Sequence, residues 1–179
     1  NISIAEEETL LILGDSISAG YGINKKDNWV YLMQQKFYEE GNSIKLINSS
    51  VSGDTTGGGL GRLAKNLKKF DPDFVLIELG GNDALRGYSI KLIKSNLEKM
   101  IALIKQNKSK VLLMQIRIPP NYGQKYMLAF EKIYKDLALS EEVYLMPFML
   151  EEIGINSDLM QPDGIPVSYT HLTLPTIVD

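Results

Sequence analysis

The chain has 179 residues, which is enough for one domain around a single hydrophobic core. Its net charge of −3 offers no basic surface to nucleic acid, and the lack of cysteine with a single histidine excludes disulfides and argues against a zinc site. No run approaches the roughly 18 to 20 apolar residues of a membrane-spanning helix, so we expect no integral membrane segment.

Residues 1–8 are expected to form a leader outside the domain. The chain does not begin with Met, and Ser3-Ile4-Ala5 places small residues at the positions that a signal peptidase reads. The leader is either the end of a signal peptide or a disordered extension. The first interpretation predicts a periplasmic or secreted protein, whereas the second also fits a cytoplasmic one.

Apolar runs rich in Leu, Ile and Val alternate with amphipathic stretches along the chain. The apolar runs predict strands at Thr9–Gly14, Ile44–Val51, Phe74–Gly80, Lys110–Ile116 and Val143–Phe148. The amphipathic stretches predict helices near Trp29–Glu40, Leu60–Lys69, Ser89–Gln106 and Gly123–Leu139. Strands that are apolar on both faces belong to a parallel sheet covered by helices on each side. With right-handed crossovers, this predicts an α/β fold, a flavodoxin-like three-layer α/β/α sandwich with a mainly parallel five-stranded sheet.

Ligands of such sheets bind beyond the carboxyl ends of the strands, so the segments that follow the strands are the candidates for a site. Gly14-Asp15-Ser16 follows the first strand. Ser16 is either the N-cap of a helix or a nucleophile whose own backbone N–H helps to hold an oxyanion. A lone G-D-S is more typical of the cap.

The segments after the second, third and fifth strands are also rich in Gly, Asp and Asn. Gly53 would let its backbone N–H approach a ligand, and Asn82 would supply a side-chain donor or simply form a turn. The glycine run at 57–61 admits a phosphate-binding loop, but it lacks both the G-x-G-x-x-G spacing and the G-K-[ST] ending. Asp163-Gly164-Ile165 follows the fifth strand.

In this order, G-D-S, Gly, G-x-N-D and D-G-I resemble the sequence blocks of the SGNH hydrolases, or GDSL esterases, over residues 9–165. Within them, Leu11–Gly20, Ser52–Thr55 and Glu78–Asp83 are similar to the branch of bacterial thioesterase I, lysophospholipase L1 and arylesterase. The resemblance implies a serine hydrolase that cleaves acyl esters or thioesters through an acyl-serine intermediate. It implies no cofactor and no metal, and we expect a monomer.

The resemblance also implies roles for single residues. Ser16 would be the nucleophile, and the oxyanion hole would combine the backbone N–H groups of Ser16 and Gly53 with the side chain of Asn82. Asp163 would orient a catalytic His three residues further on. Asp15 and Asp83 are expected to be structural, bonding the turns that present Ser16 and Asn82.

The sequence departs from the family pattern at its C-terminal end. Pro166 stands where the catalytic His is expected, and the only His is His171. Val167–Thr176 (VSYTHLTLPT) matches one reading frame through an adapter of sequencing libraries. We therefore expect residues 166–179 to be a non-native tail. The domain at 9–165 would then be truncated, and its catalytic His would be missing. The alternative is a genuine divergent C-terminus.

Two other functions fit the same fold. One is a non-catalytic binding protein for small molecules. The other is a nucleotide binder, although G-D-S after the first strand is unlike a loop that cradles phosphate. Apolar residues in the loops after the third and fourth strands would either line an acyl groove or serve in ordinary loop packing: Leu85, Tyr88, Ile118, Pro119 and Tyr122.

Overall fold

The computed structural model of the protein describes residues 7–149. The strands are β1 (Thr9–Gly14), β2 (Lys45–Asn48), β3 (Phe74–Glu78), β4 (Lys110–Met114) and β5 (Tyr144–Met146). The helices are α1 (Ser16–Ala19), α2 (Trp29–Glu39), α3 (Thr56–Phe70), α4 (Gly81–Leu85), α5 (Ile90–Gln106) and α6 (Gln124–Ser140), with 3-10 turns η1 (Lys25–Asp27) and η2 (Pro120–Tyr122). The predictions that concern the leader up to residue 6, Asp163, Pro166 and His171 lie outside the described residues.

The strands form one parallel sheet in the order β2-β1-β3-β4-β5, which confirms the predicted fold class. The chain runs from β1 outward to β2 and then crosses back to β3 on the other side of β1. Strand β1 therefore lies between β2 and β3. Their carboxyl ends lie next to one another at one edge of the sheet, where such folds bind their ligands.

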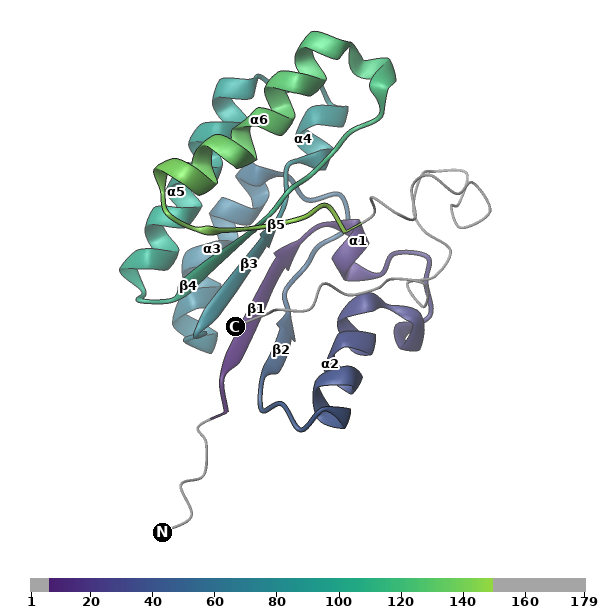
Figure 1. Ribbon diagram of the computed structural model, residues 1–179, viewed down its shortest axis with the longest axis vertical. Coiled ribbons are helices and arrows are strands. Elements are labelled where there is room, and N and C mark those ends of the chain that lie inside the picture. Colours follow the sequence, from purple (N-terminus) through teal and green to yellow (C-terminus); the bar gives the residue numbers. More distant parts are fainter. Residues whose placement is uncertain (1–6, 150–179) are drawn as a thin grey trace.

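Helices cover both faces of the sheet (Figure 1). Helices α3, α5 and α6 pack side by side as one layer, and α2 lies on the opposite side beside β2. Right-handed crossovers require this division, because the connections to β2 and to β3 run in opposite directions along the sheet. Leu11, Ile12 and Leu13 in β1 are fully buried, as expected for a strand that is covered on both faces.

Helix α3 begins at Thr56, earlier than the start predicted near Leu60, so the glycine run lies inside the helix. The Thr55 hydroxyl caps the helix by accepting a hydrogen bond from the Gly58 N–H at 3.2 Å. The glycines allow close packing. A Cβ at Gly58 would lie 1.9 Å from Oδ1 of Asp54, and one at Gly59 would lie 2.3 Å from Cδ1 of Leu79. The run is thus part of a packed helix and not a phosphate-binding loop.

The described residues contain no helix that is long and apolar enough to cross a membrane. Between residues 7 and 149 there is also no cluster of three or more acidic or histidine side chains that could hold a metal ion.

Candidate active site

Ser16 is the first residue of the short helix α1, directly beyond the end of β1. Asp15 precedes it as the N-cap, and its Oδ1 accepts a hydrogen bond from the backbone N–H of Ile17 at 3.1 Å. Asp15 is buried, whereas Ser16 is half-buried. The N-cap is therefore Asp15 and not Ser16, whose side chain is left partly open to solvent.

Gly53 lies in a tight turn beyond the end of β2. The turn is closed by a hydrogen bond from the Asp54 N–H to the Val51 carbonyl at 3.1 Å, and the Val51 N–H donates to the Gly14 carbonyl at 3.1 Å. Gly53 has a φ of +74°, which L side chains rarely adopt. This turn thus lies directly beside Gly14, the last residue of β1. Gly14 precedes Ser16 by two positions in the sequence.

Asn82 lies in α4, beyond the end of β3. Its Nδ2 donates a hydrogen bond to Oδ2 of Asp15 at 3.1 Å, so its side chain points at the turn that carries Ser16. Asn82 and Gly53 are both half-buried, like Ser16. The structure thus brings the three predicted residues together on adjacent strand ends, while Asp163 and the position of the expected His lie outside the described residues.

Asp83 connects two of these strand ends. Its carboxylate accepts hydrogen bonds from the backbone N–H of Thr56 at 2.8 Å and from the Thr56 hydroxyl at 2.6 Å. The Thr56 hydroxyl also accepts a hydrogen bond from Nδ2 of Asn96 at 3.0 Å. Asp83 is structural, as expected, but its partner is the start of α3 and not the turn that presents Asn82. It holds the loop after β2 to the loop after β3.

A buried carboxyl group supports the Ser16 turn from the end of β3. Oε2 of Glu78 accepts hydrogen bonds from the Ser18 hydroxyl at 2.6 Å and from the Asp15 N–H at 3.3 Å. Trp29 donates its indole N–H to the same hydroxyl at 3.2 Å. A Cβ at Gly14 would lie 2.4 Å from Oε2 of Glu78, so this glycine is what lets the carboxyl approach. Glu78 could not be predicted as a supporting residue from the sequence, because it lies within an apolar run.

The two acids behave differently from exposed ones. Burial raises the pKa of Glu78 well above 4.5, and the neighbouring charge of Asp15 raises it further. Burial also raises the pKa of Asp15 to about 6, against the lowering effect of the hydrogen bonds from Ile17 and Asn82. At neutral pH, Asp15 is therefore mostly ionised. An ionised Asp15 is the stronger acceptor for the Asn82 amide.

The residues suggested for an acyl groove separate into two groups. Ile118 is buried and packs in the core, so ordinary packing accounts for it. Leu85, Tyr88 and Tyr122 are exposed by 46%, 38% and 38% and are free to contact a ligand. Tyr126 in α6 donates its hydroxyl to the Tyr88 carbonyl at 2.6 Å, which ties the loop after α4 to α6.

Comparisons with known proteins identify the family to which the chain is similar. Residues 12–174 match the model of the GDSL-like lipase/acylhydrolase family. The chain is 50% identical to an arylesterase from Vibrio mimicus, over 88% of this chain and 79% of the relative. It is 44% identical to thioesterase 1/protease 1/lysophospholipase L1 from Escherichia coli K12, over 90% of this chain and 76% of the relative. The crystal structure of TesA superposes with a TM-score of 0.86 at 43% identity, covering 90% of this chain and 89% of that one.

Proposed function

The chain belongs to the GDSL-like lipase/acylhydrolase family, and from this we propose that it cleaves carboxylic esters or acyl thioesters through an acyl-serine intermediate on Ser16. Its curated relatives are an arylesterase and a thioesterase/lysophospholipase, so the enzyme is an esterase-type hydrolase. One observation carries the mechanistic proposal. Ser16, Gly53 and Asn82 come from three separate strand ends and lie at one edge of the sheet, half-exposed above buried carboxyl groups.

In the proposed reaction, the Ser16 hydroxyl attacks the acyl carbon and its proton passes to a base. The resulting oxyanion is held by the backbone N–H groups of Ser16 and Gly53 and by the Asn82 amide. Collapse of this tetrahedral intermediate expels the alcohol or thiol and leaves an acyl ester on Ser16. Water then attacks that ester by the same route and releases the acid.

The base is the part of this proposal that rests on sequence alone. Asp163 would orient a His at the position where this chain has Pro166, and a proline side chain cannot accept a proton. We therefore propose that the chain as it stands lacks its base. For the experiments below, the restored chain is the version in which residues 166–179 are replaced by a segment that begins with His and is designed to form an amphipathic helix.

The proposed substrates are small acyl esters and thioesters with an apolar acyl group. Leu85 and Tyr88 support this because they expose apolar surface at the end of the Asn82 helix and in the loop that follows it. Charge supports it as well, since a chain with a net charge of −3 has no general attraction for polyanions.

The test is covalent labelling of the restored chain by a fluorophosphonate, which traps an activated serine as a stable phosphonate ester. Ser16→Ala should abolish labelling, while Ser140→Ala, at the exposed end of α6, should leave it unchanged. Mass spectrometry of the labelled peptide should place the adduct on Ser16. Labelling that persists in Ser16→Ala would refute the assignment, and a restored chain that neither labels nor hydrolyses esters would favour a non-catalytic binding protein.

A further inference from the structure

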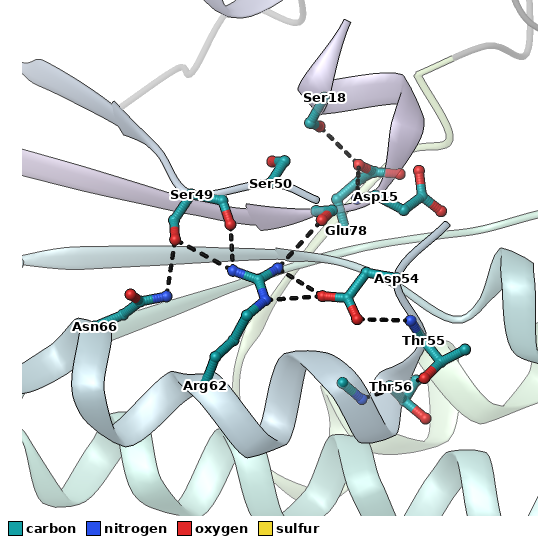
Figure 2. Close-up of polar contacts among 12 residues, drawn as sticks. Asp15, Ser18, Ser49, Ser50, Asp54, Thr55, Thr56, Arg62, Asn66 and Glu78 are labelled. Atoms are coloured by element: carbon teal, nitrogen blue, oxygen red, sulfur yellow. Dashed lines mark hydrogen bonds and ion pairs between the residues drawn. The ribbon is translucent and has the colours of Figure 1, made fainter. Parts of the chain in front are cut away.

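The guanidinium group of Arg62 lies beneath the candidate site, where it contacts the ends of two strands and the turn after β2 (Figure 2). Its Nε and Nη2 atoms each lie 2.8 Å from Oδ2 of Asp54. Its Nη1 atom donates to the Ser49 carbonyl and to the Ser49 hydroxyl, the latter at 3.2 Å. Nη2 also donates to the Gly14 carbonyl at 3.4 Å.

The partners of Arg62 are the immediate neighbours of two groups assigned to the oxyanion hole. Asp54 follows Gly53 directly, and Gly14 stands two residues before Ser16. Ser49 is the first residue beyond β2, so it anchors the start of the loop that carries Gly53. A single planar cation thus links the segment before Ser16 to both ends of the segment that contains Gly53.

We propose that Arg62 is a positioning residue, which sets the separation between the backbone N–H groups of Ser16 and Gly53. The inference rests on the proposed function, because it is this pair of N–H groups that would hold the oxyanion. Arg62 touches neither substrate nor nucleophile, and it acts through Asp54 and Gly14.

The surroundings of the ion pair are built to hold it in one geometry. The side chains of Arg62 and Asp54 are only 23% and 10% exposed, so water screens the pair weakly. The other carboxylate oxygen of Asp54, Oδ1, accepts the Thr55 N–H at 2.9 Å. That oxygen occupies the space left free by Gly58, where a Cβ would lie 1.9 Å away. The glycine in α3 and the arginine one turn later therefore fix the same carboxylate from two sides.

Arginine suits this place better than lysine. A guanidinium carries several donors in one plane and can serve Asp54, Ser49 and Gly14 together, whereas an ammonium is a single point charge on a flexible stem. Asn66, one turn further along α3, provides a matched control. It donates from Nδ2 to the Ser49 hydroxyl at 2.8 Å, and the structure gives it no bond to Asp54 or Gly14.

The kinetic experiment compares Arg62→Met, Arg62→Lys, Asp54→Asn and Asn66→Ala in the restored chain with a short-chain aryl ester. Displacing one oxyanion donor should lower kcat on the order of 10²-fold in Arg62→Met and Asp54→Asn, with KM changed by less than about threefold. The kcat of Arg62→Lys should lie between the kcat of these variants and that of the parent. Asn66→Ala should keep kcat within about threefold, even where its melting temperature falls. The double variant Arg62→Met/Asp54→Asn should lose no more than either single one, because both act on the same contact.

A second measurement needs no catalysis and uses the chain as it stands. In ¹H–¹⁵N spectra, Arg62→Met and Asp54→Asn should shift the amide signals of both Ser16 and Gly53, and Asn66→Ala should leave both in place. Amide signals that do not move would overturn the proposal. It would also be overturned if Arg62→Met and Asn66→Ala lost the same amount of kcat at equal stability. If Ser16→Ala retains full activity while the two amide signals move together, the proposed function fails and the positioning role of Arg62 stands.

Discussion

The side-chain amide of Asn82 donates one hydrogen bond to Oδ2 of Asp15, at 3.1 Å. An amide nitrogen carries two hydrogens, so this contact uses one of them and orients the other. The same carboxylate receives the Ile17 N–H through Oδ1. Asp15 thereby sets the orientation of the Asn82 donor and of the first turn of α1 with a single side chain.

Asn82→Ala in the restored chain should lower kcat by roughly 10² to 10³-fold with little change in KM, because the lost donor acts on the transition state more than on bound substrate. Steady-state kinetics with an aryl ester provide the measurement. Asn82→Asp is the matched variant, since it keeps the size of the side chain but removes the donor and should be at least as impaired. A raised KM with an intact kcat would instead make Asn82 a substrate-binding residue.

Glu78→Gln should change the pH dependence of stability. The pKa of Glu78 is raised in the folded state, so the folded protein binds this proton more tightly than the unfolded chain does. Its contribution is present in full below pH 4.5 and is lost as the pH rises toward the folded-state value. A neutral Gln has no such dependence and keeps an acceptor for Ser18.

Melting temperatures of the parent and of Glu78→Gln, measured from about pH 4.5 to 8.5, should therefore converge or cross as the pH rises. Curves that stay parallel over this range would show that Glu78 does not titrate differently in the folded state. Ser140→Ala should run parallel to the parent, because this exposed side chain does not titrate in the range.

Gly80→Ala should destabilise the fold by about 1 to 3 kcal/mol or more. Gly80 has a φ of +120°, and a Cβ there would lie 2.1 Å from the Tyr134 hydroxyl, which donates to the Leu79 carbonyl at 2.8 Å. Gly61→Ala is the control, because it lies in α3 with nothing within 4 Å of its added Cβ. It should stabilise the protein by about 0.5 to 1 kcal/mol. Urea unfolding measures both, and equal stabilities for the two variants would contradict the packing described for Gly80.

The restored chain should hydrolyse esters faster than the unaltered chain by a factor on the order of 10⁴ or more, since a Ser/His/Asp site without its base loses about that much. In the unaltered chain, His171→Ala should change nothing, because no pattern relates His171 to Asp163. Equal rates for the unaltered and the restored chain, together with a loss on His171→Ala, would identify His171 as the base.

The elements and the three donors of the site could be predicted for specific reasons. Apolar runs such as Thr9–Gly14 are unambiguous when a strand is covered on both faces, and in a parallel sheet they also indicate where the site lies. Ser16, Gly53 and Asn82 then follow from residue type, since each sits just beyond such a run and each can present a donor.

The supporting residues could not be predicted in the same way. Arg62 occurs among the lysines of an amphipathic helix, where a cation usually faces water, and only the tertiary structure places it against Asp54. The start of α3 was missed because glycine disfavours helices in isolation. In the folded protein this cost is offset, since Gly58 and Gly59 admit Asp54 and Leu79 at distances that no other residue allows.

The order of the strands has a consequence for how this enzyme could diversify. Because β1 lies between β2 and β3, every group proposed to bind the oxyanion is encoded before residue 83, and the described chain after that point contributes none. The loop after β4 is thus free to vary in length and sequence without moving Ser16, Gly53 or Asn82. Recombination between relatives at the loop after α4 would exchange the loop after β4, with Tyr122, and leave the groups proposed to stabilise negative charge untouched.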